Sequence, residues 1–380
     1  MLKINQIFLF LFCFLQWSCA QNSLIIGAYQ TQNYLPQLKD RSVGIVANQT
    51  SMINATHLVD SLLSSGVNIV KVFSPEHGFR GKADAGAHIS DSIDKKTALP
   101  IISLYGKNKK PSPEQLKGID ILLFDIQDVG ARFYTYISTL HYVMESAAEH
   151  KIPVVVLDRP NPNGHYIDGP VLDTNFRSFV GMHPVPIVHG MTIGEYAQMI
   201  NKEAWLDGSL NCDLTIIPMV NYNRNIIYRL PVKPSPNLPN AQSINLYPSL
   251  CLFEGTNVSV GRGTSLPFQH YGSPNLNSDY SFIPYTGAGS KYPKHEGLEC
   301  FGRDLSQFNQ LNQLNLNFLI EAYRTSSEKD KFFNSFFDKL AGNSWLKQQI
   351  IEGKSVEEIR ESWQEDLGKF KQIRQKYLMY

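Results

Sequence analysis

The sequence predicts an α/β fold in which helices cover both faces of a parallel β-sheet. Five short apolar runs recur within the first 160 positions, and two stretches with apolar residues at every third or fourth position lie among them. Because the runs are apolar at consecutive positions, both faces of each strand should be buried, as in a parallel sheet. The length of 380 residues and the 43% hydrophobic content suit about two globular domains.

The first part of the predicted sheet comes from three of these runs. Residues 42–48 (SVGIVAN) form the first predicted strand, and residues 57–65 form a helix that ends at Gly66, because glycine terminates helices. The apolar run at residues 68–73 predicts the second strand. Residues 101–105 (IISLY) predict a short third strand after a polar loop.

The remaining strands alternate with helices. Residues 119–125 (IDILLFD) predict a strongly apolar fourth strand, and residues 135–150 follow with the apolar spacing of a helix. The run PVVVL at residues 153–157 predicts the fifth strand. A helix is expected at residues 192–205 and another strand at residues 214–219.

A proline-rich stretch predicts the boundary between two domains. Residues 231–240 (PVKPSPNLPN) hold four prolines in ten positions, which is typical of a linker. We therefore expect a first domain at residues 21–235 and a second at residues 236–380. The second domain should end in helices at residues 343–352 and 356–378.

The first 20 residues predict an export signal. Lys3 supplies a positive charge, and the apolar run at residues 7–15 is too short to span a membrane as a mature helix. Two processing routes stay open, since the small residues around Cys19 fit cleavage before Gln21 and Cys19 itself fits lipidation. Either route predicts an exported protein that is periplasmic, an outer-membrane lipoprotein or secreted. Membrane contact is expected only through a lipid anchor on Cys19.

Charge and cysteine content exclude several classes of partner. The chain has 35 Lys and Arg against 34 Asp and Glu, and removal of Lys3 with the signal leaves 34 of each. Nucleic-acid binding depends on clustered cations, so no nucleic acid is expected as a partner. The three cysteines beyond the signal are too widely spaced for a disulfide framework or a zinc site, and we expect no metal.

The stretch SPEHGFRG at residues 74–81 is the first candidate for a site. It follows a predicted strand, and ligands of open α/β sheets bind at the carboxyl ends of strands. Glu76 beside His77 suits general acid–base chemistry, and His77 and Arg80 are candidate substrate ligands. The alternative is a surface turn in which Glu76 pairs with Arg80.

The stretch DIQDVGARFY at residues 125–134 leaves the fourth predicted strand. Asp125 and Asp128 are candidate catalytic carboxylates, because a carboxylate that ends an apolar strand is costly unless it is paired or used. Arg132 is a candidate anion ligand, and Tyr134 a candidate substrate ligand. The alternative is that Asp128 caps the next helix and Arg132 is solvated.

Two further clusters supply candidate ligands. Asp158 and Asn161 in DRPNPNG suit hydroxyl or amide groups, although a plain turn explains the same residues. Glu254 is a further candidate catalytic carboxylate in FEGTNVSVGRGT, where a structural turn is the alternative. The remaining candidates are Asn237, Asn257 and Arg262, of which Asn237 lines the cleft or belongs to the hinge.

Other chemistries lack their motifs. No G-x-G-x-x-G follows the first strand, and no G-x-S-x-G, H-E-x-x-H or P-loop pattern occurs, so neither a dinucleotide nor another cofactor is expected. Carboxylates, arginines, asparagines and aromatic residues remain, including 18 Tyr and 21 Phe. This set, with export and a neutral charge, suits a carbohydrate ligand.

The strings SPEHGFRG, LLFDIQDVGARFYTY, DRPNPNG, PSPNLPN and FEGTNVSVGRGT resemble, in this order, the NamZ-type exo-β-N-acetylmuramidases. This glycoside hydrolase family was long known as a domain of unknown function, and the likeness covers residues 43–380. The resemblance implies a Rossmann-like doubly wound parallel sheet followed by a smaller α/β domain, with the site between them. It also implies release of N-acetylmuramic acid from the non-reducing end of peptidoglycan fragments. Glu76 stands at the position of the family's catalytic glutamate, and Ser265 departs from an acidic residue expected there.

The sequence therefore predicts an exo-acting glycosidase whose partners are muramic acid saccharides derived from peptidoglycan. Glu76 is the expected general acid; Asp125, Asp128 or Glu254 is the base or nucleophile, unless the substrate's acetamido group attacks. The lactyl carboxylate should meet Arg132, or Arg262 as second choice. These acids should share one pocket with a loop of the second domain. The alternatives are a non-catalytic sugar-binding exported lipoprotein and, from the strand pattern alone, an oxidoreductase.

Overall fold

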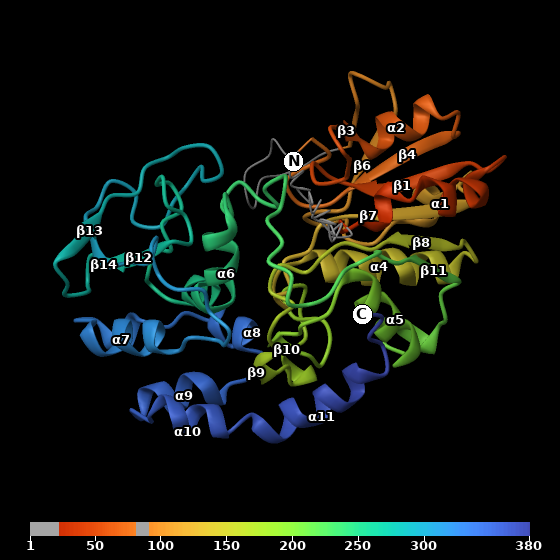
Figure 1. Cartoon of the computed structure of the whole chain (residues 1–380). Helices are drawn as coiled ribbons and strands as arrows, with labels where there is room; N and C mark the ends of the chain where they lie inside the picture. Colours follow the sequence, from red (N-terminus) through yellow and green to blue (C-terminus); the bar gives the residue numbers. More distant parts are fainter. Residues whose placement is uncertain (1–22, 81–90) are drawn as a thin grey trace, which may run out of the picture.

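The computed structural model describes residues 23–80 and 91–380, which form two lobes (Figure 1). The signal predicted at residues 1–20, with Cys19, and Gly81 of the first candidate stretch lie outside the described residues. Within the described ranges no helix is long and apolar enough to cross a membrane.

The first lobe is built on a seven-stranded sheet. In spatial order the strands are β11 (Leu214–Ile217), β8 (Val154–Leu157), β7 (Ile121–Asp125), β1 (Val43–Ala47), β4 (Ile69–Ser74), β6 (Pro100–Ser103) and β5 (Ser92–Ile93). All neighbours are parallel except β5, which pairs antiparallel with β6. Numbered along the chain, the six parallel strands follow the doubly wound order 3-2-1-4-5-6, which reverses between β1 and β7. The predicted α/β fold is confirmed.

Both faces of this sheet are buried, as its apolar strands predict. The covering helices are α1 (Thr31–Leu38), α2 (Leu58–Ser64), α4 (Tyr136–Glu149) and α5 (Ile193–Lys202). Successive side chains of a strand point to opposite faces. Leu122 and Phe124 of β7 accordingly join the core that holds α4 and α5, whereas Leu123 joins the core that holds α1 and α2.

Several short elements were not predicted, because two- to four-residue strands carry little pattern. They are β2 (Met52–Ile53), β3 (Thr56–His57), α3 (Pro113–Leu116), β9 (Asp168–Val171), β10 (Pro186–Val188), and the 3-10 turns η1 (Gly27–Tyr29), η2 (Thr174–Phe176), η3 (Asp207–Ser209), η4 (Cys251–Gly255) and η5 (Lys329–Lys331). β2 pairs with β3 and β9 with β10, both antiparallel.

The second lobe combines a small antiparallel sheet with helices. Its elements are α6 (Ala241–Leu250), β12 (His270–Ser273), β13 (Tyr280–Phe282), β14 (Cys300–Asp304), α7 (Asn317–Thr325), α8 (Phe337–Ala341), α9 (Trp345–Ile351), α10 (Val356–Glu361) and α11 (Gln364–Gln375). The long helix predicted at residues 356–378 is therefore two helices. They separate at Trp363, whose backbone (φ −113°, ψ 0°) leaves the helical conformation while its side chain stays buried in the core.

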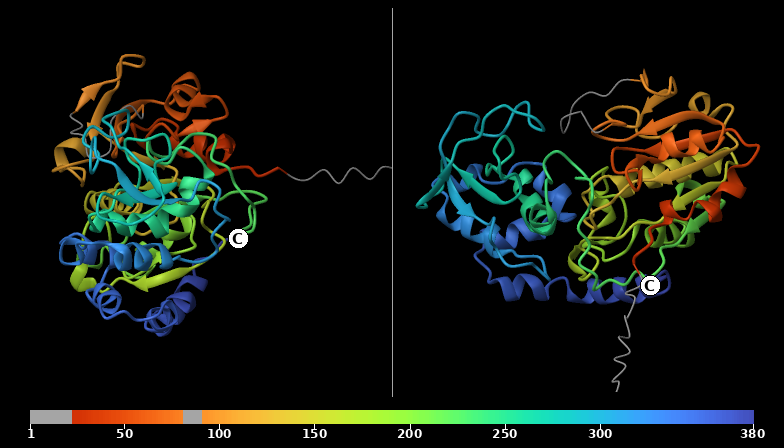
Figure 2. Two further views of the ribbon diagram at one scale, coloured as in Figure 1. Left: turned by 90° about the vertical axis from the view of Figure 1, so that its left-hand side faces the viewer. Right: turned by 45° about the horizontal axis from the view of Figure 1, so that its top comes forward.

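The end of the chain returns to the first lobe. α11 packs against β9 and runs along the bottom of the molecule, and the C-terminus lies beside α5 (Figure 1; the right-hand view of Figure 2 shows the same path). The core on the α4 and α5 face continues into the second lobe and includes Trp363 and Phe370. The domain boundary at residues 235 and 236 stays a prediction.

Candidate active site

A narrow cavity lies where the carboxyl end of β4 meets the second lobe. We call it the interlobe cavity; its lining is Glu76, His77, Phe133, Tyr134, Thr135, Tyr136, Ser235, Asn237, Leu238, Tyr247, Arg262 and Phe268. It encloses about 60 Å³. The structure thus brings together five of the predicted site residues, from two lobes.

Glu76 reaches this cavity because the chain turns sharply after β4. His77 and Gly78 both adopt left-handed conformations, with φ of 73° and 75°. Such a conformation is strained for a residue with a side chain, and strained residues cluster at functional sites. Glu76 is partly buried, and the Tyr105 hydroxyl donates a hydrogen bond of 2.9 Å to its Oε1. Among the described residues, Glu76 is the one carboxylate in the lining.

Arg262 brings a positive charge to the cavity from the second lobe. Its Nε donates to Glu254 Oε1 at 2.8 Å, and its guanidinium lies over the Phe268 ring, 5.0 Å from the centroid. Burial opposes ionisation of Glu254, but the charges of Arg262 and Lys294 outweigh it and hold the pKa of Glu254 below its usual range. Glu254 is therefore ionised and positions Arg262. It lies outside the lining, so its expected role as base or nucleophile stays a prediction.

Aromatic rings form most of the walls. Tyr134, Tyr136, Tyr247 and Phe268 pack edge to face, with centroids between 4.8 and 5.7 Å apart. Burial raises the pKa of Tyr134 well above its usual range, so its hydroxyl stays neutral and donates to the Pro234 carbonyl at 2.9 Å. Aromatic walls with a carboxylate and a guanidinium between them suit a ligand that has both apolar and polar groups.

Asp125 does not reach the cavity. Arg159, which follows β8, donates to its two oxygens at 2.5 and 2.8 Å, and both side chains are buried. The expectation that Asp125 is a catalytic carboxylate is thereby corrected, because its oxygens are bonded inside the first lobe.

Arg132 is the largest departure from the predicted site. Its side chain is fully buried, and it donates to the carbonyls of Pro170 and Val185 at 2.8 Å. It also donates to the carbonyls of Leu340 and Ala341, at 2.9 and 2.8 Å, so it ties the two lobes together. Its expected role as the lactyl ligand is corrected, because these contacts occupy both terminal nitrogens outside the cavity.

Asp128 is buried close behind the cavity wall without lining it. Its Oδ2 accepts a bond of 2.6 Å from the Gly130 amide and lies 3.8 Å from His189 Nε2. Burial raises the pKa of Asp128 to about 7. No part of it contributes to the lining, so its expected role in direct catalysis stays a prediction.

Asp158 fastens the end of the chain. Its Oδ2 accepts hydrogen bonds from the hydroxyls of Thr192 and Tyr380, at 2.8 and 2.7 Å. Its Oδ1 accepts from the Gly194 amide at 2.8 Å, and burial raises the pKa of Asp158 to about 7. Asn161 forms a turn by accepting from the Asn163 amide at 2.8 Å. Neither predicted ligand lines the interlobe cavity, so both expectations are corrected.

Arg80 and Asn257 also lie outside the lining. The expected role of Arg80 is corrected by its ion pairs, whereas that of Asn257 stays a prediction, since its side-chain oxygen and nitrogen are buried without a hydrogen-bond partner. Arg80 pairs with Asp94 at 2.8 Å and with Asp60 at 3.4 Å, not with Glu76. The backbone of Asn257 holds neighbouring segments, since its amide donates to the Phe332 carbonyl at 2.8 Å.

Sequence reasoning missed most of the cavity walls. Phe133, Thr135 and Tyr136 adjoin Tyr134 in the string RFYTY, and this dense aromatic run could have indicated a wall. Tyr247 and Phe268 gave no such signal, because they lie far from the other lining residues in the sequence.

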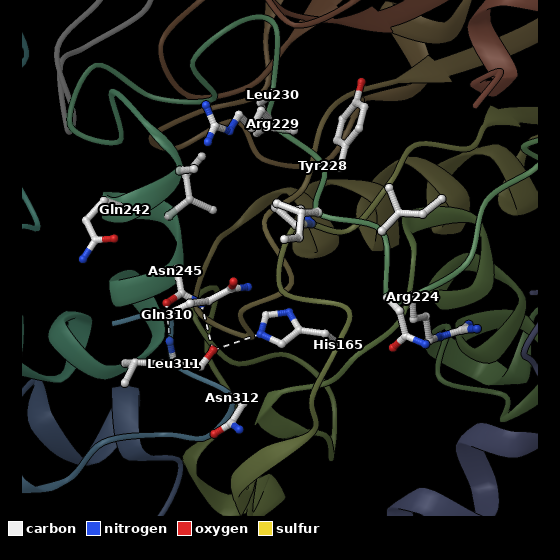
Figure 3. Close-up of a pocket in the computed structure, with 16 residues that line it drawn as sticks. His165, Arg224, Tyr228, Arg229, Leu230, Gln242, Asn245, Gln310, Leu311 and Asn312 are labelled. Carbon is white, nitrogen blue, oxygen red and sulfur yellow. Dashed lines mark hydrogen bonds between the residues drawn. The ribbon is translucent and has the colours of Figure 1, made fainter. Parts of the chain in front are cut away.

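A second and larger cavity, of about 540 Å³, lies between residues 224–230 and the start of α6 (Figure 3). On its floor His165 Nε2 and the Leu311 carbonyl are 2.9 Å apart. It shares no lining residue with the interlobe cavity and holds none of the predicted site residues. In the described part of the chain no three His, Cys, Asp or Glu residues are placed to hold a metal ion.

The sequence predicted that several acids share one pocket with a loop of the second domain, and the structure shows this arrangement for one of them. Glu76 meets Asn237 and Arg262 across the interlobe cavity, whereas Asp125 and Arg132 lie elsewhere.

Known proteins match this chain along nearly its whole length. The N-terminal family profile described as "Exo-beta-N-acetylmuramidase NamZ" matches residues 43–242, and the C-terminal profile of the same description matches residues 245–380. The peptidoglycan β-N-acetylmuramidase NamZ of Bacillus subtilis (strain 168) is 42% identical over 379 residues, 92% of this chain and 89% of the Bacillus protein. Two crystal structures of DUF1343 family proteins from Bacteroides fragilis NCTC 9343 cover 94% of this chain and 99% of their own. Their identities are 48% and 28%, with TM-scores of 0.88 and 0.79.

Proposed function

The chain belongs to the NamZ family of exo-β-N-acetylmuramidases, and we propose that it is a glycosidase that removes N-acetylmuramic acid from the non-reducing end of peptidoglycan fragments. The single observation that carries this proposal in the molecule is the interlobe cavity, in which a carboxyl group and a guanidinium share one aromatic pocket.

Glu76 is the residue that we assign to proton transfer. In its protonated form it donates to the glycosidic oxygen as the bond from that oxygen to C1 breaks. Its carboxylate then accepts a proton from the water that supplies the hydroxyl on C1. Because Glu76 is the one carboxylate among the described lining residues, we assign the first attack on C1 to the acetamido oxygen of the substrate. Two displacements at C1 then predict retention of configuration, which NMR of the fresh product measures.

Arg262 is the residue that we assign to recognition of the muramic acid. The lactyl group of this sugar carries a carboxylate that glucosamine lacks, and guanidinium groups bind carboxylates strongly. Glu254 and the Phe268 ring fix the orientation of Arg262, so the cation is held in place before the sugar arrives. This arrangement favours muramides over glucosaminides.

A product analysis tests the proposal. The purified protein is incubated with the disaccharide MurNAc-β-1,4-GlcNAc, and the products are identified by mass spectrometry. We expect free MurNAc and GlcNAc in equal amounts. Saturable binding of the disaccharide without any product would instead support the non-catalytic sugar-binding protein.

We also propose that the protein is exported and, through Cys19, anchored to a membrane by lipid. The support is the sequence of residues 1–20, with its apolar run and its cysteine among small residues. Membrane fractions of a bacterium that expresses the full chain should hold the protein, and Cys19→Ala should release it. An unchanged distribution of the variant would contradict lipidation.

A further inference from the structure

Residues 283–299, which we call the rim loop, lie against the second-lobe wall of the interlobe cavity. The loop connects β13 to β14, and the right-hand view of Figure 2 shows this stretch arching from the second lobe toward the first. The Tyr285 amide donates to the carbonyl of Gly263, the neighbour of Arg262, at 2.9 Å. Asn237 Nδ2 donates to the Gly289 carbonyl at 2.7 Å. The rim loop thus contacts the cavity lining directly.

The rim loop is firmly held in this position. Lys294 donates to three carbonyls of the second lobe, those of Phe253, Thr256 and Val258, at 2.6 to 3.2 Å. Gly289 has a φ of 87°, and a Cβ there would lie 2.8 Å from the Pro236 Cβ, so a side chain would push the loop away. Such anchoring keeps the loop beside the cavity without a bound ligand.

Two aromatic side chains of this anchored loop face the solvent. Tyr285 is 59% exposed and Tyr292 is 81% exposed. Lys291 lies over the Tyr292 ring, 5.3 Å from its centroid. A tyrosine ring on the surface of a loop that contacts the cavity lining offers a ligand both an apolar face and a hydroxyl group.

We propose that Tyr285 and Tyr292 form a platform for the sugar that follows the terminal muramic acid. The inference rests on the proposed function, in which the cavity takes one sugar and the remainder of the chain leaves through the mouth. The apolar face of a pyranose ring packs on an aromatic ring, while the tyrosine hydroxyl remains available for hydrogen bonds. The two tyrosines determine specificity for the leaving group, and the bond-breaking step itself does not involve them.

Steady-state kinetics on two substrates test this role. One substrate is MurNAc-β-1,4-GlcNAc, and the other is methyl β-N-acetylmuramide, which has no ring beyond the scissile oxygen. For Tyr292→Ala and Tyr285→Ala we expect kcat/KM on the disaccharide to fall by about three- to tenfold. On the methyl glycoside kcat/KM should stay within twofold of wild type. Tyr292→Phe should keep most of the disaccharide activity, because the ring remains.

A matched control removes an exposed apolar side chain elsewhere. Ile227 is 75% exposed and lines the larger cavity, so Ile227→Ala should leave both substrates unaffected. Equal losses on the two substrates, or no loss on the disaccharide, would overturn the platform alone. A wild-type protein that cleaves neither substrate would overturn the proposed function, and the platform with it.

Discussion

The strands β4 and β7 each lead into an acidic side chain at the same edge of the sheet, but the two acids have different surroundings. Glu76 follows β4, and Tyr105, just after the neighbouring strand β6, supplies a hydroxyl to it. Asp125 ends β7, and the neighbouring strand β8 supplies the guanidinium of Arg159. Asp125 forms a buried ion pair with Arg159, whereas Glu76 lines a cavity.

An acid at the end of a strand is therefore not evidence of a site by itself. What the adjacent strand places beside it decides whether it serves catalysis or stability. Four substitutions test this distinction, and their expected effects decrease from the first to the last.

Glu76→Gln should have the largest effect. Loss of the transferable proton should lower kcat on the disaccharide by about 10²- to 10⁴-fold. The free energy of unfolding should change by less than about 0.5 kcal/mol, because the side chain is partly exposed and its shape is kept. Product release over time and urea denaturation measure the two quantities. Wild-type turnover by this variant would remove Glu76 from the chemistry.

Asp125→Asn should show the opposite pattern. Removing one partner of a buried ion pair costs about 3 to 5 kcal/mol of unfolding free energy, since Arg159 is left buried and unpaired. The folded fraction should keep kcat within about tenfold of wild type, because Asp125 does not reach the cavity in which the reaction takes place. Asp120→Asn is the matched control, because Asp120 is exposed just before the same strand. A stable but inactive Asp125→Asn protein would erase the distinction between the two acids.

Asp128→Asn tests the buried acid with the shifted pKa. The folded-state pKa of Asp128 is raised from 3.8 to about 7, so the folded protein binds this proton more tightly than the unfolded chain. The resulting stability is complete below pH 4 and is lost as the pH rises toward 7. Relative to wild type, the variant should therefore gain up to about 4 kcal/mol between pH 4 and pH 8. Denaturation curves of both proteins at the two pH values measure this gain. The same stability difference at pH 4 and pH 8 would show that Asp128 does not bind the proton more tightly in the folded protein.

Arg262→Ala should have the smallest effect of the four, and a selective one. Loss of a charged hydrogen bond to the lactyl group should lower kcat/KM on muramides by about 10- to 100-fold. Residual activity on the matching glucosaminides should fall much less. Arg303→Ala serves as control, because Arg303 is an exposed arginine of the same lobe that pairs with Glu321. Equal losses on both sugars would exclude lactyl recognition by Arg262.

The sequence predicted the sheet well because its information is local. The run 119–125 is apolar at most positions, and β7 covers Ile121–Asp125 with both of its faces buried. The antiparallel strands of the second lobe were missed: β13 and β14 are partly exposed, and β12 is buried but holds His, Tyr, Gly and Ser in place of an apolar run. Burial of Trp363 between α10 and α11 depends on tertiary contacts, so one long helix was expected there.

The site was predictable in part for the same reason. Glu76 and His77 were found because strand, turn and polar residues adjoin in the sequence. Arg132 was assigned to the site wrongly because its hydrogen-bond partners are backbone carbonyls, two of them more than 200 positions away. Every residue has a backbone carbonyl, so the sequence cannot show which ones Arg132 will contact. Arg262 reaches the cavity only because the second lobe folds back against β4.

The most direct measurement is a crystal structure of Glu76→Gln with MurNAc-β-1,4-GlcNAc bound. We expect the lactyl carboxylate within hydrogen-bond distance of Arg262 and the glycosidic oxygen within hydrogen-bond distance of residue 76. A sugar bound in the larger cavity of Figure 3, or a muramic acid whose lactyl group points away from Arg262, would contradict the roles assigned to the interlobe cavity.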